Sequence, residues 1–274
     1  GQQVLLTEVG PDVFKNCTSL ECLIFPEYFN QKFDISWIEG DKSLKYIKIP
    51  NVDMKLVAED DLTFEELMAQ LPAEFYFEGP AESEIHDISK TNSFAFKYLD
   101  EEIYEKVINA SGDAGSGQSV FRVNNFNELI YFYMDDTVKQ IDIPGIIGPY
   151  KITVIGSDSF QANHRLTKIT IPSTITEIQD NAFKGCHRLE HVIFEEPISL
   201  TSIGEGAFDT QVIDPILDTC TLESKPKLTF TAPAEEGSAP FDYAMDSSNN
   251  INTGTQELTY ITFYTGWPSN LPIQ

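Results

Sequence analysis

Long apolar runs, cysteines and basic residues are all scarce in this sequence. No run of about eighteen apolar residues occurs, so nothing predicts a membrane-spanning segment. The 4 cysteines are too few for a disulfide scaffold in 274 residues and form no Cys-x-x-Cys pair, which disfavours metal clusters and thioredoxin-like chemistry. Only 18 basic residues stand against 43 acidic ones, and the net charge of −25 repels nucleic acid phosphates and anionic membranes. We therefore expect no nucleic acid partner and no insertion of this chain into a membrane.

The apolar content is nevertheless ordinary, at 41%, and aromatic residues make up 12%. A chain of 274 residues with this composition can bury a sizeable core in one large domain or two smaller ones, so we expect a globular protein. The sequence begins at Gly1 and not at Met, and we expect it to be trimmed from a longer protein. The lack of a targeting segment therefore says little about where the whole protein goes.

Two stretches repeat one pattern 23 residues apart: 155-IGSDSFQANHRLTKITIP-172 and 178-IQDNAFKGCHRLEHVIFE-195. The same frame occurs at 9-VGPDVFKNCTSLECLIFP-26 and begins again at 202-SIGEGAF-208. Partial copies with the pattern L-x-x-I-x-I occur at 44-LKYIKIP-50, 138-VKQIDIP-144 and 258-LTYITFY-264. A fixed period of this kind predicts a repeat architecture.

Each repeat is expected to contain a turn that carries a Phe, a polar corner and a short strand. One unit cannot cover its own apolar face, whereas stacking the units at about 4.8 Å buries the columns of Ile and Phe against their own copies. The Pro that follows several strands lacks an N–H group and should end the ladder there. Cys17 and Cys186 each follow the repeat Phe by three residues, and both are expected to be small buried thiols.

The pattern I-G-x-x-A-F-x-x-C-x-x-L-x-x-I-x-I-P resembles the BspA-like leucine-rich repeat of bacterial cell-surface proteins. Five positions of the second copy match it: Phe183, Cys186, Leu189, Val192 and Phe194. The first copy matches at Phe160 and Leu166, with Asn163 in the Cys position. The resemblance implies an α/β fold, a right-handed leucine-rich-repeat solenoid with short parallel strands on its concave face. It also implies binding, not catalysis.

Two further segments resemble features of the same family. Residues 75–99 are similar to its closing unit, in which a strand, a turn and a helix over about 81–91 cap an array. Residues 141–156 resemble its opening unit. We therefore predict two consecutive arrays, the first over 1–100 and the second over 120–274, joined by a flexible linker at 101–119 that holds the Gly/Ser-rich stretch ASGDAGSGQS. The second array should carry a long insertion over 209–257, and a further helix is expected to begin at Thr63.

The repeat gathers basic side chains at matching positions. His164 and His187 share one position, as do Arg165 and Arg188, so each pair should lie about one strand spacing apart at the corner before the sheet. Lys168 and His191 form the next column and should point outward from neighbouring strands. In so acidic a chain this is the one predictable basic ridge. It is either a set of solvated corner residues inherited from a common ancestral repeat or a site for an anionic ligand or partner.

Outward strand positions give a second candidate surface. The side chains expected there are Cys22 and Ile24, Tyr46 and Lys48, Gln140 and Asp142, Lys168 and Thr170, His191 and Ile193, and Tyr260 and Thr262. Tyr46, Tyr260 and the exposed isoleucines are more aromatic and apolar than a solvated sheet requires, and such groups are enriched at interfaces. The alternative is that insertions cover this sheet.

The sequence offers little support for catalysis or a bound metal. His187 and His191 have the spacing of a helical zinc pair, but the repeat places one in a corner and the other on a strand. The Gly-rich stretch lacks the Gly-Lys-Ser/Thr of a phosphate-binding loop. The carboxylates of Asp60-Asp61 and Asp135-Asp136 are adjacent in sequence and tend to point apart, unlike the opposed pair of a glycosidase. We predict no catalytic residues, no cofactor and no metal.

These observations favour a non-enzymatic, surface-exposed binding or adhesion protein. It would recognise a host or microbial macromolecule, protein or glycan, through the concave sheet and the insertions, and the resemblance implies an extracellular location at a bacterial cell surface. Two other hypotheses stay open at this point. One is a β-helix-like enzyme that degrades polysaccharides, and the other is a spacer that holds another domain away from the cell wall.

Overall fold

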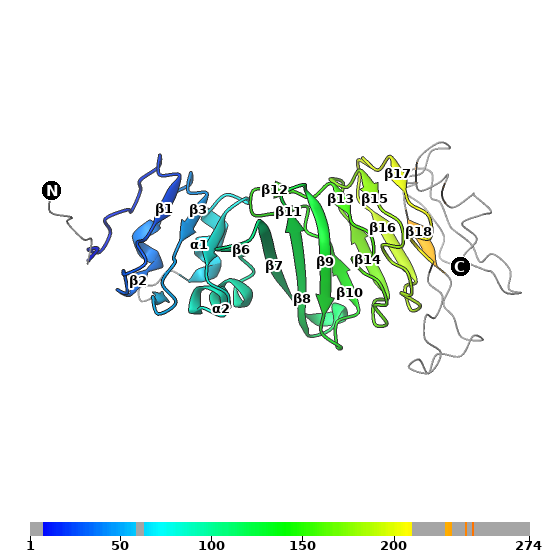
Figure 1. Cartoon of the computed structure of the whole chain (residues 1–274), viewed down its shortest axis with the longest axis horizontal. Coiled ribbons are helices and arrows are strands. Elements are labelled where there is room, and N and C mark those ends of the chain that lie inside the picture. Colours follow the sequence, from blue (N-terminus) through cyan, green and yellow to red (C-terminus); the bar gives the residue numbers. More distant parts are fainter. Residues whose placement is uncertain (1–7, 59–62, 210–227, 232–238, 240–242, 244–274) are drawn as a thin grey trace, which may run out of the picture. The chain divides into compact units, whose positions relative to one another are not determined.

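The computed structural model describes residues 8–58, 63–209, 228–231, 239 and 243 (Figure 1). Their regular secondary structure is mostly strands, with few helices. They form two compact units, which are described separately. The first comprises residues 1–109, 120–125 and 146–150, and the second comprises 110–119, 126–145 and 151–274. Within the described residues, no helix has both the length and the apolar character needed to cross a membrane.

The first unit is built on short strands in the order β1-β3-β5-β6-β7. Their bounds are Cys22–Ile24 for β1, Tyr46–Lys48 for β3, Tyr76–Gly79 for β5, Ala95–Tyr98 for β6 and Ile103–Ala110 for β7. The first four pair in parallel, with Leu23 opposite Ile47 and Ile47 opposite Phe77, whereas β7 is antiparallel to β6. These inward side chains are buried, as the repeat frame predicts. Each strand therefore adds one layer to a common core.

Smaller elements cover the side of this core. They are β2 at Phe33–Asp34, the 3₁₀ helix η1 at Ile35–Ile38, β4 at Leu56–Val57, α1 at Phe64–Gln70 and α2 at Glu84–Thr91. Helix α1 begins after Thr63, as predicted, because Thr63 Oγ1 accepts a hydrogen bond from the Glu66 N–H (3.2 Å) while the Glu66 carboxylate accepts one from the Thr63 N–H (2.8 Å). Helix α2 begins after Ser83, so the predicted order of strand, turn and helix over 75–99 is confirmed.

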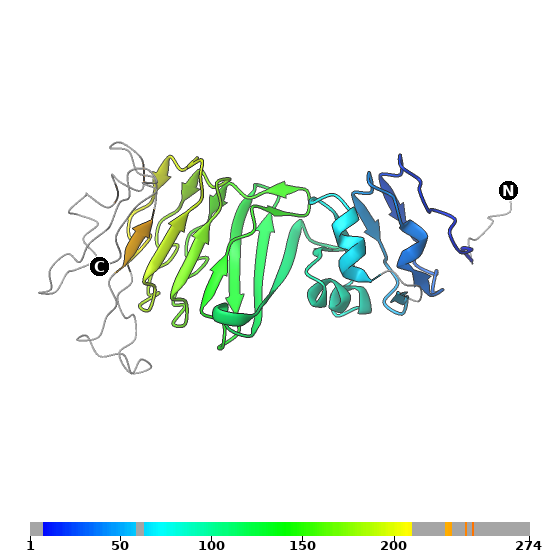
Figure 2. The ribbon, with the colours of Figure 1, turned by 180° about the vertical axis from the view of Figure 1, so that it is seen from behind.

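The second unit stacks its repeats through two sets of strands. One set, the last four strands of a longer sheet, has the order β9-β13-β15-β17, with bounds Glu128–Met134, Val154–Ile155, Glu177–Ile178 and Ser202–Ile203. The other has the order β10-β14-β16-β18, with bounds Gln140–Asp142, Lys168–Ile171, His191–Phe194 and Thr229–Thr231. The pairs β14–β16 and β13–β15 are parallel, and the partners differ by the predicted 23 residues. Figure 2 shows these strands side by side from behind.

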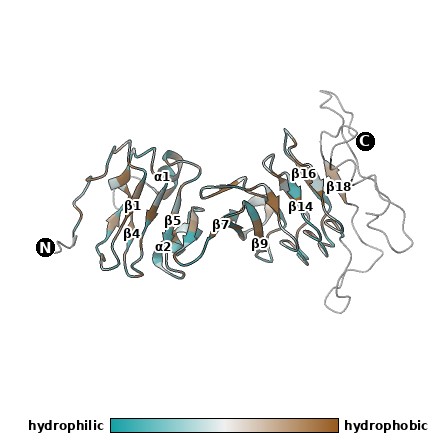
Figure 3. Ribbon diagram, turned by 45° about the horizontal axis from the view of Figure 1, so that its top comes forward, coloured by the Kyte–Doolittle hydropathy of each residue, from teal (hydrophilic) through white to brown (hydrophobic). Residues whose placement is uncertain are grey.

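A column of phenylalanines forms the core between these two sheets. The rings of Phe132, Phe160, Phe183 and Phe208 follow one another with centroid separations of 4.5, 4.7 and 4.8 Å. Phe183 thus lies between Phe160 and Phe208, as the repeat frame predicts, and all three are fully buried. Figure 3 shows hydrophobic residues on other strands too, for example β1 and β9, whereas α2 is largely hydrophilic.

The stretch 101–119, predicted to be a flexible linker, contains regular structure. Residues 103–110 form β7, η2 spans Gly112–Ala114 and β8 spans Gly117–Asn124. Phe121 and Val123 occupy alternate positions of β8 and are fully buried, which is the pattern of a strand with one buried face. The glycines that precede them make this alternation hard to recognise in the sequence. The glycines serve the tight connection between the strands, where Gly112, Gly115 and Gly117 all have positive φ. The strands are a correction to the expected irregular linker, and the division into two arrays stays a prediction.

Two smaller points concern the opening unit and the cysteines. Residues 141–156 include the two-stranded pair β11, Ile146–Ile147, and β12, Tyr150–Lys151. Cys186 is buried, as predicted, and its Sγ lies 3.1 Å from the carbonyl oxygen of Phe160 in the preceding repeat. Cys17 is exposed, contrary to the prediction, because it lies in the first repeat that the structure describes and no described corner precedes and covers it.

Candidate ligand-binding pocket

Three successive corners of the second unit enclose a pocket. The corners follow Phe132, Phe160 and Phe183, and backbone hydrogen bonds keep the last two in register, with Phe160 N–H donating to Ala182 O and Ala162 N–H donating to Lys184 O at 2.9 and 2.8 Å. The pocket has a volume of about 540 Å³. Volumes of about 300 to 1,000 Å³ are typical of small-molecule sites, so this hollow can admit part of a ligand.

Four of the predicted site residues meet in this pocket. His164, Arg165, His187 and Arg188 all line it. The Nδ1 atoms of the two histidines are 3.1 Å apart and their ring centroids 4.9 Å, which confirms the predicted spacing of one strand. In such a contact one Nδ1 donates and the other accepts, so at least one of the two imidazoles is neutral. A role for these residues in ligand binding stays a prediction.

The charge of Arg165 is partly balanced within the chain. Its Nε lies 3.9 Å from Oδ1 of Asp136, and the two side chains are 52% and 87% exposed. An ion pair this long and this exposed contributes little to stability. The guanidinium keeps hydrogen-bond donors for another group.

Asp136 lies in the pocket at a position that was not predicted from the sequence. The segment 132-FYMDDTV-138 has its Val six positions after its Phe, as 160-FQANHRL-166 and 183-FKGCHRL-189 have their Leu, so Asp136 corresponds to His164 and His187. The pairing of Gln140 with Lys168 in neighbouring strands confirms this alignment. The sequence feature that could have identified Asp136 is the interval of six positions from Phe132 to Val138. It is hard to recognise because the preceding strand β9 does not follow the repeat pattern.

Neighbouring polar groups point in defined directions. Asp135, adjacent to Asp136, turns away from the pocket and accepts hydrogen bonds from the Gln118 N–H (2.7 Å) and the Tyr133 hydroxyl (3.3 Å). This agrees with the expectation that the two carboxylates diverge. Asn163 also lines the pocket, and its Oδ1 accepts from the Arg165 N–H at 3.3 Å, which leaves its amide N–H groups as donors.

The remaining predicted residues lie outside the pocket. Lys168 and His191 are register partners on β14 and β16, as the repeat predicts, but neither lines the hollow. Tyr46 belongs to the first unit, where its ring stacks on Tyr76 at 5.2 Å and Tyr76 meets Tyr104 edge-on at 5.0 Å. Tyr260 lies outside the described residues. Of the predicted residues that the structure describes, the two His-Arg pairs line the pocket, and Lys168, His191 and Tyr46 do not.

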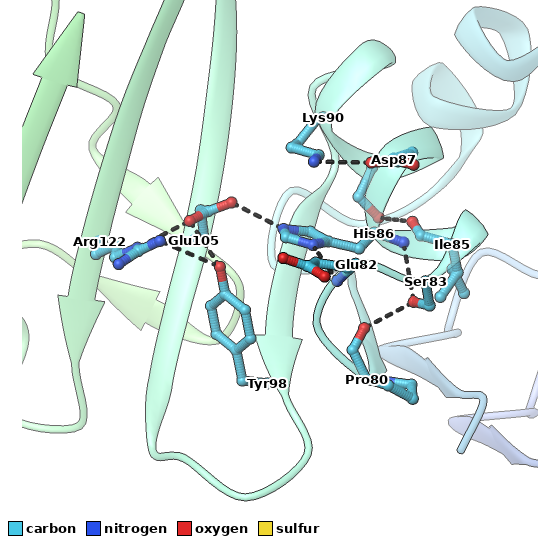
Figure 4. Close-up of polar contacts among 11 residues, drawn as sticks. Pro80, Glu82, Ser83, Ile85, His86, Asp87, Lys90, Tyr98, Glu105 and Arg122 are labelled. Carbon is cyan, nitrogen blue, oxygen red and sulfur yellow. Dashed lines mark hydrogen bonds and ion pairs between the residues drawn. The ribbon is translucent and has the colours of Figure 1, made fainter. Parts of the chain in front are cut away.

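A second polar cluster, unforeseen in the sequence, is buried in the first unit (Figure 4). Glu105 on β7 accepts hydrogen bonds from His86 Nε2 at 3.0 Å, the Tyr98 hydroxyl at 2.8 Å and Arg122 Nε at 2.8 Å. The Glu82 N–H donates to His86 Nδ1 at 3.2 Å, so a neutral His86 carries its proton on Nε2 and donates it to Glu105. The four side chains come from α2, β6, β7 and β8 and tie these elements together.

The electrostatics of this cluster indicate a structural role. Burial alone raises the pKa of Glu105, but the hydrogen bonds from His86, Arg122 and Tyr98 outweigh it and hold the pKa at about 2. A general base that works near neutrality needs a pKa close to 7, which this carboxylate is far from having. Among the described residues, no group of three or more His, Cys, Asp or Glu is placed to hold a metal ion.

The repeat pattern, the parallel ladders and the stacked Phe column point to one family. A family model for the BspA type leucine-rich repeat region matches the chain in 6 copies, over residues 3–62 and 118–228. The chain belongs to the BspA-type leucine-rich repeat family. The match covers more than half of the sequence and includes all three corners of the pocket. No curated protein matches the chain.

Two solved structures are similar to parts of this BspA-type chain. A leucine-rich cell surface protein from Faecalibacterium prausnitzii is 26% identical over 47% of this chain and 34% of its own, with a TM-score of 0.25. The pneumococcal vaccine antigen PcpA is 23% identical over 48% of this chain and 39% of its own, with a TM-score of 0.21. The chain thus spans between a third and two fifths of the length of these proteins.

Proposed function

We propose that this BspA-type repeat chain is a non-enzymatic binding protein exposed at a bacterial cell surface, where it recognises a host or microbial macromolecule. In this proposal the repeats form a right-handed solenoid, and its function is to hold a binding surface rigidly. Membership of the family supports a surface location, and the similar F. prausnitzii protein is itself a cell surface protein. The recognised macromolecule is a protein or a glycan that carries anionic groups.

The observation that carries this proposal is the pocket at the three stacked corners. It places exposed guanidinium groups, those of Arg165 and Arg188, around a hollow in a chain whose net charge is −25. Guanidinium groups bind carboxylates and sulfates through paired hydrogen bonds. Neither arginine contributes to the Phe column, and their place at the rim of a hollow fits ligand recognition.

The proposal can be tested by applying the chain to arrays of sialylated and sulfated glycans and of extracellular matrix proteins. We expect binding that falls with rising salt and that Arg165→Ala/Arg188→Ala abolishes, while the melting temperature of the variant is unchanged or higher. The same glycans incubated with the chain should release no new reducing ends. Release of reducing ends would favour a polysaccharide-degrading enzyme, and no binding on any array would favour a spacer.

A further inference from the structure

We infer that the corner pocket is a subsite for one acidic sugar residue, a pyranose ring that bears a carboxylate. This inference rests on the proposed function and names the chemical class of the group bound at the pocket. Three features of the pocket carry it: a cationic end, an anionic end and an aromatic wall. The carboxylate and the aromatic residues come from the corner at Phe132, and the arginines come from the next two corners, so the repeat sets how far apart these corners lie.

The cationic end fixes the position of the ligand carboxylate. Arg165 and Arg188 occupy equivalent positions of neighbouring repeats, and stacking places such positions about 4.8 Å apart. Both side chains line the same hollow, and an anion bound between them would offset the repulsion between their like charges. Asn163, in the same corner as Arg165, adds amide donors. A carboxylate bound here would gain charge-assisted hydrogen bonds from both arginines.

The anionic end selects against a simple anion. Asp136 stands one repeat before His164 and lines the same pocket, with its side chain 87% exposed. A sulfate or phosphate ion in the hollow would be repelled by this carboxylate, whereas a hydroxyl group would donate a hydrogen bond to it. The pocket therefore suits a ligand with negative charge at one end and hydroxyl groups at the other.

Size and wall chemistry point to a sugar ring. Arg188 stands two repeats after Asp136, about 10 Å along the stack, which matches a single pyranose with its substituents, while Arg165 stands between them and reaches Asp136 at 3.9 Å. Phe132 and Tyr133 line the pocket, and Tyr133 is 49% exposed. A pyranose has an apolar C–H face that can lie against an aromatic ring while its hydroxyls reach Asp136 and Gln161. An acidic peptide side chain would reach the arginines but would present no such ring of hydroxyls.

The inference can be tested by calorimetric titration of the whole chain with D-glucuronate, N-acetylneuraminate, D-glucose, inorganic sulfate and a short Glu-rich peptide. We expect the two sugar acids to bind more tightly than the other three. Arg165→Gln and Arg188→Gln should each weaken binding of the sugar acids about tenfold to a hundredfold, because each removes a charge-assisted hydrogen bond. Lys184→Gln is the matched control, since it removes a charge from the same corner as Arg188 but does not line the pocket.

Asp136→Asn gives the discriminating result. It removes the repulsion of simple anions and weakens the acceptor for sugar hydroxyls, so sulfate should bind more tightly and the sugar acids no more tightly or more weakly. If sulfate and the sugar acids both bind more tightly to the variant, the pocket is a plain anion site and the inference is overturned. Preferred binding of the Glu-rich peptide, or no sugar acid binding at all, also overturns it. Loss of the inference leaves the proposed function testable, because the arrays report binding by any part of the chain.

Discussion

At the scale of single residues, the repeat can be read most directly in its Phe column. Phe183 stacks on Phe160 at 4.7 Å and on Phe208 at 4.8 Å and is fully buried. Phe183→Ala should lower the free energy of unfolding by about 3–5 kcal/mol, because it removes the transfer energy of a ring and leaves a cavity. Chemical denaturation measures this change. Phe126, 76% exposed, is the control, and its replacement by Ala should have little effect. Equal stability of the two variants would contradict the assigned repeat frame.

The buried carboxylate of Glu105 should make the stability of the folded chain depend on pH. Its pKa is about 2 in the folded chain, below its ordinary value of 4.5, so its contribution is fully present above about pH 4.5 and is lost as the pH falls toward 2. At pH 7 this contribution is on the order of 3 kcal/mol. Glu105→Gln should therefore destabilise the chain at pH 7, and the difference from the original chain should narrow as urea denaturation is repeated between pH 5 and pH 3. The exposed Glu101→Gln should show no such convergence.

At the scale of elements, local capping chemistry decides where helices begin. Thr63→Ala removes the hydroxyl that accepts from the Glu66 N–H, and it should cost about 1 kcal/mol of stability. Thr63→Ser keeps the acceptor and is the matched control. Hydrogen exchange of the α1 amides measures the effect, and we expect faster exchange in the Ala variant alone. Unchanged exchange would show that packing of α1, and not its cap, determines the start of the helix.

Some of the helices and strands could be predicted from the sequence and others could not. The repeat strands that precede a Pro and the start of α1 after Thr63 were predictable, because a period or a cap marks each locally. Helix α2 was predictable because residues 75–99 resemble the closing unit of the family. Strands β7 and β8 were not, since their pairing depends on contacts with neighbouring strands and the glycines between them resemble a linker. The basic side of the pocket followed from the repeat, but Asp136 did not, because its repeat is irregular before Phe132.

At the scale of the whole molecule, the boundary between the compact units differs from the predicted linker at 101–119. Residues 120–125 and 146–150 follow that stretch in sequence but group with the first unit. Two contacts within that unit explain the grouping: Arg122 bonds to Glu105 at 2.8 Å, and the ring of Tyr150 meets that of Tyr104 at 5.0 Å. The chain therefore crosses between its units more than once, which ties the stability of each to segments on both sides of residues 110–119.

This crossing predicts the outcome of a single cut. A site-specific protease sequence inserted between Gly112 and Asp113, both exposed, would allow cleavage at one point. The two fragments should stay together on size-exclusion chromatography in native buffer, because the second fragment supplies Arg122 and Tyr150 to the core of the first unit. Combining the cut with Arg122→Ala/Tyr150→Ala should release them, while a cut chain with Lys139→Ala, an exposed change in the second unit, should stay intact. Two folded fragments that separate after the cut alone would instead support independent arrays on either side of 101–119.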